Sequence, residues 1–381
     1  MKLSAMLLLA VMVASCAAAP VAPPPGYLFK DQLFTAPSEG INADDVFAVS
    51  EEMRHYLRTE IADQLRIKGP QQGLIDAIYS RDLLKVEYDS ARTRNAAQTF
   101  HERTGNCLSL VIMTAALAKE LGLPVGFHNV VVDEMWARSG DLYFSVGHVN
   151  LTVGKRQSNL LSRNDDNALI TIDFVPQGDT RGQRSRPLAR ETVVAMYMNN
   201  RAAEALAREQ VSDAYWWARA AITQDPKFVS SYNTLGVVYR RHANLSEAEK
   251  VLNHALEREP DNVHVMSNLA MVLTDEGRSA EAQVLSAKVR QREPYPPFYF
   301  FDLGQTAMGA KDFKSARDFF AKEVARDAYN HEFHFWLAAA YSGLGEVALS
   351  RRHLAIAMEF SNTRKEHDLY AAKLARLNAN K

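Results

Sequence analysis

Apolar residues follow three different patterns along the chain, and each pattern predicts a different kind of element. Residues 107–121 are apolar on nearly every side of a helix, which predicts a buried helix. Short runs rich in β-branched residues predict three strands, at residues 125–132, 142–153 and 168–175. Residues 195–364 instead carry a helical pattern that recurs at a fixed interval. The pattern therefore predicts a first half with both helices and strands and a second half with helices alone.

The two later strands place polar side chains on one face. In the second strand the faces are Val149, Leu151 and Val153 on one side and His148, Asn150 and Thr152 on the other. In the third strand Asp173 alternates with Ile172 and Phe174. We therefore expect His148 and Asp173 to lie side by side on neighbouring strands, on the more polar face of each.

Cys107 begins the buried helix, which Thr104 or Asn106 is suited to cap. A thiolate in the first turn of a helix is stabilised by free N–H groups and by the helix dipole. A nearby imidazole takes the thiol proton, and a carboxylate on the far ring nitrogen fixes the tautomer. The order Cys107, His148, Asp173 therefore predicts thiol catalysis. Taken singly, the first two residues are also typical of a buried structural cysteine and a strand histidine.

Three other residues are alternatives to the histidine or the aspartate of this predicted set. Asp165 and Asp166 are alternatives to Asp173, but they lie in a polar loop where we expect solvated side chains. His128 is an alternative to His148, but its strand precedes the hairpin and no aspartate follows at a matching distance. The set Cys107, His148 and Asp173 therefore remains the preferred hypothesis.

The sequence around the cysteine resembles a known family of thiol enzymes. The run Arg103-x-Gly105-Asn106-Cys107-Leu108-Ser109, followed by residues 118–125, is similar to bacterial members of the transglutaminase-like superfamily, a papain-like thiol fold. The resemblance covers roughly residues 80–180 and implies an α+β domain at residues 44–190, with helices packed on an antiparallel sheet. It implies that Cys107 is the nucleophile, His148 the base and Asp173 the orienting acid.

Two details of this resemblance stay open. Many members of the superfamily carry an aromatic residue directly after the histidine, whereas Val149 stands here, so the shape of the substrate channel is undetermined. The backbone N–H of Cys107 is one donor for an oxyanion. A second donor is not identified, and Gln98 is near only in sequence.

Proline, alanine and leucine recur every 34 residues in the second half. The matching positions are Pro226, Pro260 and Pro294; Ala214, Ala248, Ala282 and Ala316; and Leu235, Leu269, Leu303 and Leu337. Small residues let two helices approach closely, and proline ends the second helix of each pair. The pattern resembles the tetratricopeptide repeat, a helix–turn–helix unit that stacks into an all-α solenoid.

The predicted array occupies residues 195–364 and is capped by a helix at residues 365–381. Its full repeats lie near 229–262, 263–296, 297–330 and 331–364, after a degenerate unit near 195–228. The resemblance implies that the concave face binds a protein or peptide. The positions expected to face that groove include Asn233, Arg240, His264, Phe298, Phe301 and Phe335. The alternative is that the array is a spacer or a dimerisation element.

The N-terminus carries an export signal. Lys2 precedes an apolar run, residues 3–14, that is too short to span a membrane as a helix. Residues 13–16 resemble the lipobox of bacterial lipoproteins, which implies a signal peptide at residues 1–15 and lipid on Cys16. Residues 16–43 then form an acylated, Ala/Pro-rich tether. The alternative is an ordinary secretory signal cut near Ala18 or Ala19.

Composition limits the partners and the chemistry. The formal net charge of −1 predicts no binding of nucleic acid or of an anionic membrane surface. The chain has two cysteines, so lipid on Cys16 leaves Cys107 as the sole thiol and allows no internal disulfide. His331 and His334 lie in a repeat helix without a second acidic partner, so we expect no metal site there.

These features predict a lipoprotein of the bacterial cell envelope. The residue after Cys16 is alanine, which in the lipoproteins it resembles goes with the outer membrane and a periplasmic orientation. We expect a thiol enzyme of transglutaminase-like type that acts on amide or peptide bonds as an amidase, protease or acyltransferase, without a metal or organic cofactor. The alternative is a non-catalytic periplasmic scaffold whose repeats bind envelope proteins. The sequence leaves open the substrate, the acceptor and the choice between hydrolysis and transfer.

Overall fold

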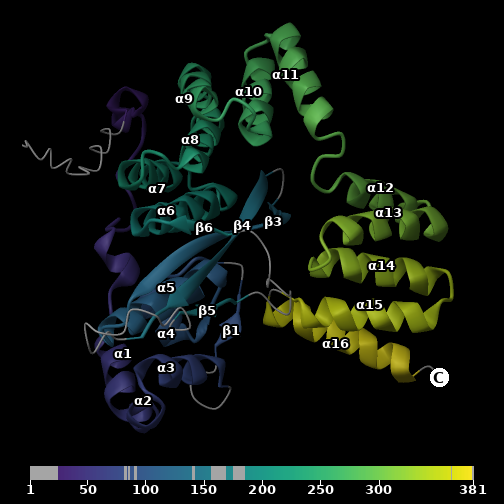
Figure 1. Cartoon of the computed structure of the whole chain (residues 1–381). Helices are drawn as coiled ribbons and strands as arrows, with labels where there is room; N and C mark the ends of the chain where they lie inside the picture. Colours follow the sequence, from purple (N-terminus) through teal and green to yellow (C-terminus); the bar gives the residue numbers. More distant parts are fainter. Residues whose placement is uncertain are drawn as a thin grey trace, which may run out of the picture.

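The computed structural model describes residues 25–80, 84, 86–89, 92–139, 142–155, 169–174, 185–361 and 363–379. Cys16, Asp165 and Asp166 lie outside these residues, as does the predicted signal peptide. A small sheet with its helices forms the first half, and helical pairs form the second (Figure 1). Within the described ranges no helix has both the length and the apolar character needed to cross a membrane.

Short helices lead up to the cysteine. They are η1 (Gly26–Leu28), η2 (Asp31–Leu33), η3 (Asp44–Phe47), α1 (Glu51–His55), a π-helical turn η4 (Tyr56–Glu60), α2 (Ala62–Lys68), α3 (Pro70–Tyr79), α4 (Ala96–Glu102) and α5 (Cys107–Glu120). The apolar run after Asn106 forms α5 as the pattern predicts, and Gly122 follows it with φ 70°. Of the two predicted caps, Asn106 is the one that accepts the helix N–H group.

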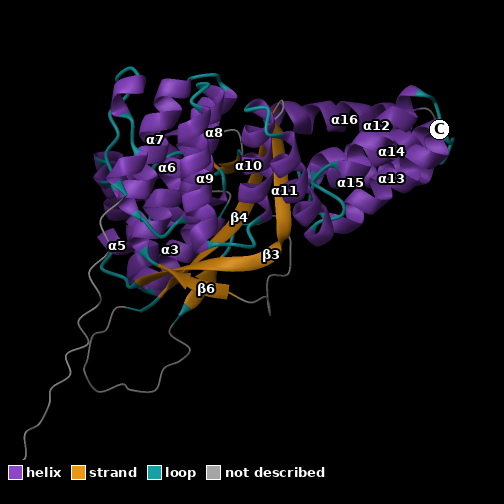
Figure 2. Ribbon diagram, turned by 90° about the horizontal axis from the view of Figure 1, so that it is seen from above, coloured by secondary structure: helices purple, strands orange, loops and turns teal. Residues whose placement is uncertain are grey.

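Over the described residues, the main sheet has four antiparallel strands in the order β5-β4-β3-β6. They are β3 (Val125–Ser139), β4 (Leu142–Val153), β5 (Ile170–Ile172) and β6 (Ser185–Leu188). The long β3 and β4 form a hairpin that extends beyond the shorter strands (Figure 2). Two further strands, β1 (Glu87–Tyr88) and β2 (Thr104–Gly105), pair in parallel beside α5. The sequence did not predict β6, which contains a proline and is mostly exposed.

The second half consists of consecutive antiparallel helices. They are α6 (Arg190–Ala207), α7 (Val211–Gln224), α8 (Val229–Arg241), α9 (Leu245–Arg258), α10 (Val263–Asp275), α11 (Ser279–Arg292), α12 (Tyr299–Gly309), α13 (Phe313–Arg326), α14 (His331–Gly343), α15 (Val347–Glu359) and α16 (Arg364–Ala379). Gly236 shows why small residues recur, because a Cβ there would lie 2.6 Å from the side chain of Leu252 on the paired helix.

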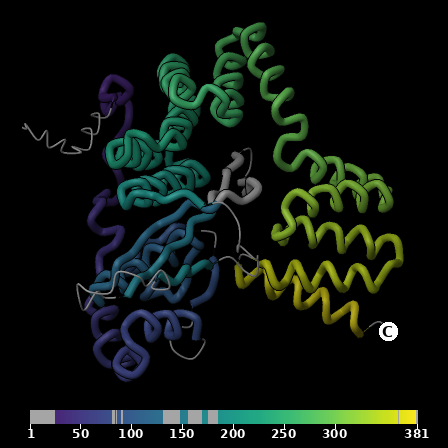
Figure 3. Tube along the Cα trace, viewed as in Figure 1, coloured from purple at the N-terminus to yellow at the C-terminus, as the bar shows by residue number. Residues whose placement is uncertain are grey.

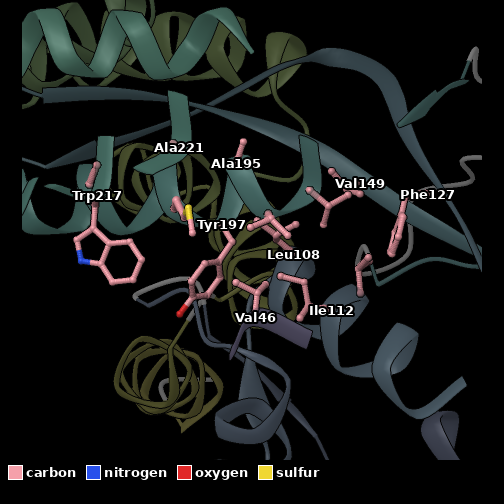
Figure 4. Packing of buried hydrophobic residues seen from close by; sticks show 14 of the residues in the cluster. Val46, Leu108, Ile112, Phe127, Val149, Ala195, Tyr197, Trp217 and Ala221 are labelled. Atoms are coloured by element: carbon pink, nitrogen blue, oxygen red, sulfur yellow. The ribbon is translucent and has the colours of Figure 1, made fainter. Parts of the chain in front are cut away.

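The sheet and the first repeats share one hydrophobic core. Leu108 and Ile112 of α5 lie close to Val149 of β4, with Tyr197 of α6 and Trp217 of α7 in the same cluster (Figure 4). The cluster continues through buried residues from α8 to α11. The helical half is therefore not an appendage, since its first six helices complete the core that supports α5.

The stacking of helices is interrupted between α11 and α12. Consecutive helices elsewhere in the array are packed together, whereas α11 and α12 are not (Figure 3). The connecting segment contains Pro294, Pro296 and Pro297, followed by Phe298 with φ 62°. Proline cannot donate a helix hydrogen bond, which displaces the start of α12. Two separate apolar clusters, one across α12–α14 and one across α14–α16, then hold the last five helices together.

Two predictions, one about the groove of the array and one about the tether, are wrong. Phe298 and Phe301 do not face a groove, because both are buried in the α12–α14 cluster. The segment before α1 is not a free tether over its described residues 25–43. Phe34 is buried and stacks on Tyr215 of α7, with ring centroids 3.9 Å apart. The aromatic side chains of this segment make it part of the core instead.

Candidate functional site

Cys107 is the first residue of α5 and the one free cysteine in the part of the chain that the structure describes. The Oδ1 atom of Asn106 accepts a hydrogen bond from the backbone N–H of Ser109 at 2.9 Å, which caps the helix. A Cβ at Gly105 would lie 2.8 Å from the Cβ of Ser109, so this close approach requires glycine. Cys107 is 8% exposed, which places the thiol at the edge of the core.

Buried polar groups fix the start of α5. The side chain of Asn106 donates to the hydroxyl of Thr93 at 2.9 Å, and the hydroxyl of Ser109 accepts from the backbone N–H of Arg94 at 2.8 Å. The backbone N–H of Thr93 donates in turn to the carboxylate of Glu204 on α6. A hydrogen-bonded path thus runs from the first helix of the helical half to the residue beside Cys107.

The histidine and aspartate predicted from the sequence meet beside this helix start. His148 lies on β4 and is 0% exposed, and its Nε2 atom is 2.8 Å from the Oδ1 atom of Asp173. Asp173 follows the last residue of β5, and Asn150 donates to its other carboxylate oxygen at 3.3 Å. The hydroxyl of Tyr79 donates to the backbone carbonyl of Asp173 at 3.1 Å. These contacts aim the carboxylate at the imidazole.

The charge of the imidazole is set by its neighbours. Burial lowers the pKa of His148, but the hydrogen bond to Asp173 and the nearby thiol of Cys107 outweigh it and raise the pKa from 6.5 to about 9. The other ring nitrogen, Nδ1, is buried and has no partner in hydrogen-bond geometry. The arrangement therefore favours an imidazolium whose Nε2–H is bonded to Asp173, with the thiol of Cys107 nearby and no partner in hydrogen-bond geometry at Nδ1 among the described residues.

Tyr88 is a residue of this site that the sequence did not indicate. It lies on β1 opposite Gly105 of β2, two residues before Cys107. Burial, and then the adjacent Cys107, raise the pKa of Tyr88 well above its usual value, while a hydrogen bond with the backbone N–H of Cys107 acts in the opposite direction. The phenol therefore keeps its proton, and it lies against the backbone N–H of the first residue of α5. A two-residue strand leaves no periodic signal, so only the tertiary structure reveals it.

A cavity of about 430 Å³ opens beside these residues. Its apolar lining comes from α3, from the segment before β1, from α5 and from the residue after Asp173, namely Ile78, Val86, Leu110, Met113 and Phe174. Glu87 is the charged residue among the described residues that line it. The cavity is thus continuous with the elements that hold Cys107, Asp173 and Tyr88.

Gln98 and His128, which the sequence offered as alternative site residues, lie in other parts of the structure. Gln98 completes a capping box at the start of α4, where its Oε1 atom accepts from the backbone N–H of Asn95 at 3.2 Å. His128 lies on β3, paired with Asn150 of β4, and no hydrogen bond between its ring and a carboxylate is found among the described residues. Neither residue therefore competes with Tyr88 or His148 for a place beside Cys107.

His331 and His334 do not come together around a metal. The Nδ1 atom of His331 is 2.8 Å from the hydroxyl of Tyr370, and that of His334 is 2.9 Å from Nδ1 of His353. Over the described ranges, no group of three or more metal-ligating side chains is present. These histidines instead join α14 to its neighbours α15 and α16.

The comparison with protein families finds a match in the helical half of the chain. Residues 229–262 match the family model of the tetratricopeptide repeat. No curated protein matches the chain. Together with the helix pairs at a 34-residue spacing, the family match shows that the second half contains tetratricopeptide repeats.

Several solved structures are similar to part of the chain. PilF of Pseudomonas aeruginosa is 19% identical, with 49% of this chain and 84% of that chain covered and a TM-score of 0.29. MamA of Desulfovibrio magneticus RS-1 is 15% identical over 45% and 96%, with a TM-score of 0.26. YrrB, a repeat protein with an unusual peptide-binding site, is 17% identical over 47% and 92%, with a TM-score of 0.25.

Proposed function

We propose that the chain is a thiol enzyme of transglutaminase-like type that acts on amide or peptide bonds. The observation that carries this proposal is the position of His148, which contacts Asp173 at 2.8 Å and lies next to Cys107 at the start of a buried helix. A cysteine, a histidine and a carboxylate in this order of contact form the usual machinery of nucleophilic thiol catalysis.

The first half of the reaction forms a thioester. The Cys107 thiol gives its proton to His148, and the sulfur attacks the amide carbonyl carbon. The resulting oxyanion takes over the backbone N–H of Cys107 from the phenol oxygen of Tyr88, and the O–H of Tyr88 then supplies a second donor. The C–N bond then breaks as His148 returns the proton to the leaving nitrogen. Asp173 stabilises the imidazolium during both transfers.

The second half releases the acyl group. Water or an amine loses a proton to His148 and attacks the thioester carbonyl carbon, and the C–S bond breaks. The thiolate of Cys107 then recovers the proton from the imidazolium. Water gives hydrolysis and an amine gives acyl transfer, and both outcomes use the same residues.

The repeats support a role in binding the protein that is modified. Tetratricopeptide repeats bind protein or peptide partners, and six of the array's helices share the core that supports α5. A partner held by the array would therefore present its amide bonds near Cys107.

We also propose that lipid on Cys16 anchors the chain to the outer membrane, facing the periplasm. Mass spectrometry of the membrane-extracted protein should find the acylated N-terminal peptide.

Generic acyl donors test the catalytic proposal before a substrate is known. p-Nitrophenyl acetate should give a burst of p-nitrophenol and an acetyl group on Cys107 that mass spectrometry detects. Cys107→Ser should abolish the burst, and Asp173→Asn should slow it by at least about tenfold, because the imidazole loses its orienting carboxylate. Added hydroxylamine should speed turnover by competing with water. A full chain that shows no burst, with the array intact, would leave the non-catalytic scaffold as the function.

A further inference from the structure

The cavity of about 430 Å³ begins one helical turn along α5 from Cys107. Leu110 and Met113 follow Cys107 on α5 by three and six residues, so they lie about 4.5 and 9 Å further along the helix axis. Phe174 directly follows Asp173, and Glu87 directly precedes Tyr88. Each wall of the cavity is therefore built on an element that also carries a residue of the thiol site.

The size and lining of the cavity suit one large side chain. Its volume of about 430 Å³ falls within the range of ligand pockets, roughly 300–1,000 Å³. The apolar residues Ile78, Val86 and Met113 offer hydrophobic contact and no charge to pair with an ionised group. Burying an unpaired charge among them would be costly. The apolar part of the lining therefore favours an aromatic or branched aliphatic side chain.

Glu87 gives the edge of the cavity a negative charge. Its side chain is 58% exposed and meets the guanidinium of Arg364, the first residue of α16, at 3.6 Å. Arg364 is itself 73% exposed, so the pair is held only weakly. A cation of the same chain thus already occupies the position beside the cavity, and a cation on a bound molecule would replace it at little cost.

We propose that this cavity is a specificity site for polypeptide substrates in which a large apolar side chain is followed by lysine or arginine. The apolar side chain fills the space between α3 and α5, and the basic side chain replaces Arg364 at Glu87. This inference rests on the proposed function, because it assigns a substrate class to the same thiol. It also makes the end of the repeat array a competitor for the site.

Chloroacetyl peptides that alkylate Cys107 measure this specificity without a known substrate. The probes are chloroacetyl-Phe-Lys-amide, chloroacetyl-Phe-Glu-amide and chloroacetyl-Gly-Gly-amide, tested on the full chain carrying Cys16→Ser, with the modified residue identified by mass spectrometry. The Phe-Lys probe should react with saturation and at least about tenfold faster than the Gly-Gly probe at low concentration, because its side chain is buried in the cavity. The Phe-Glu probe should fall between them.

Three variants separate the parts of the site. Glu87→Gln should remove the difference between the Phe-Lys and Phe-Glu probes, whereas Arg364→Gln should speed the Phe-Lys probe by about twofold to fivefold. The control Glu281→Gln removes an exposed carboxylate that also pairs with an arginine, but in α11, and should change nothing. Met113→Trp should cancel the advantage of phenylalanine by filling the cavity.

The outcomes distinguish the two proposals. If the three probes react equally fast and the reaction still depends on His148, the specificity site is wrong and the thiol enzyme stands. If all three react slowly and a His148→Gln variant reacts no differently, the proposed function is wrong. A Phe-Lys preference that survives Glu87→Gln would overturn the role of Glu87 in binding the cation.

Discussion

Polar side chains are placed in opposite ways around Cys107 and in the α8–α9 repeat. Around Cys107 the buried polar side chains have polar partners: Ser109 bonds to Asn106, and His148 and Asn150 both bond to Asp173. Between α8 and α9 the contacts are apolar, with Leu235 and Leu252 fully buried. Apolar burial stabilises the repeat directly, whereas buried polar groups cost free energy unless all are bonded. The first region is therefore organised for geometry and the second for stability.

We expect the largest effect on stability from two arginines that pair with carboxylates, one in each region. Arg94 lies near Cys107, is buried, and pairs with Asp89 at 3.0 Å and Glu102 at 2.6 Å. Arg94→Met should lower the free energy of unfolding by about 3 kcal/mol, because two partly buried carboxylates lose their partner. Urea denaturation provides the measurement.

Arg278 in the array is the matched control. It also pairs with several carboxylates, including Glu249 and Glu281 at 2.8 Å, but its side chain is 37% exposed. Water replaces the lost contacts there, so Arg278→Met should cost much less than Arg94→Met. Equal losses in the two variants would contradict the contrast between a buried polar region and a solvated repeat surface.

The stability of the first region should depend on pH through His148. Its pKa is raised to about 9 in the folded chain, so the stabilisation is complete below pH 6.5 and is lost as the pH rises through 9. The loss is on the order of 3 kcal/mol, from the free energy that accompanies each unit of pKa. Urea denaturation between pH 6 and 9.5 should show this decline in the parent chain. Asp173→Asn should flatten it, whereas His128→Gln should leave it unchanged.

A glycine tests the apolar contacts of the array. Gly236→Ala should lower the free energy of unfolding by about 1–3 kcal/mol, because its Cβ would overlap the buried Leu252. Gly309→Ala is the control, since its Cβ would meet nothing within 4 Å at the end of α12. That variant should be neutral or slightly more stable. If Gly236→Ala were also neutral, the close helix contact would not be what holds the repeat.

The smallest expected effect comes from a gap in the third helix pair. Leu252 fills the space beside Gly236, and Phe320 fills the space beside Gly304. In the repeat between them, the residues at the matching positions are Ala270 and Ser286, which are both small. They line a cavity of about 290 Å³ together with Met271. Ser286→Leu should raise the free energy of unfolding by about 1 kcal/mol by filling it. Thermal unfolding of this variant and of the exposed control Ala287→Leu measures the gain, and an equal change in both would contradict this explanation.

The array could be predicted further than the site because its information is local. Three repeat units end near a periodic proline and all four full repeats carry the periodic leucine, so the 34-residue period indicated where helices begin and end. The interruption at residues 293–298 escaped this pattern, although Pro296 and Pro297 offered a signal. The packing of the segment before α1 on the core was missed because alanine and proline dominate the start of the predicted tether, while Phe34 was the residue to notice.

The site depended on contacts between distant segments. Cys107, His148 and Asp173 each lie on the kind of element that the pattern predicts, except that Asp173 comes just after its strand ends. Tyr88 and Tyr79 had no signal, since each reaches the site from a segment with no partner nearby in sequence. Residue order thus predicted which side chains meet at the start of α5, and packing revealed the residues that surround them.

The most direct test of the thiol–imidazole pair is the rate of Cys107 alkylation by iodoacetamide at pH 6 in the full chain carrying Cys16→Ser. Cys107 is then the sole thiol. We expect fast alkylation that His148→Gln slows by at least about tenfold while His128→Gln has no effect, because the imidazolium of His148 stabilises the thiolate. Alkylation as slow as that of a simple cysteine peptide, and equal in all three proteins, would contradict the central claim.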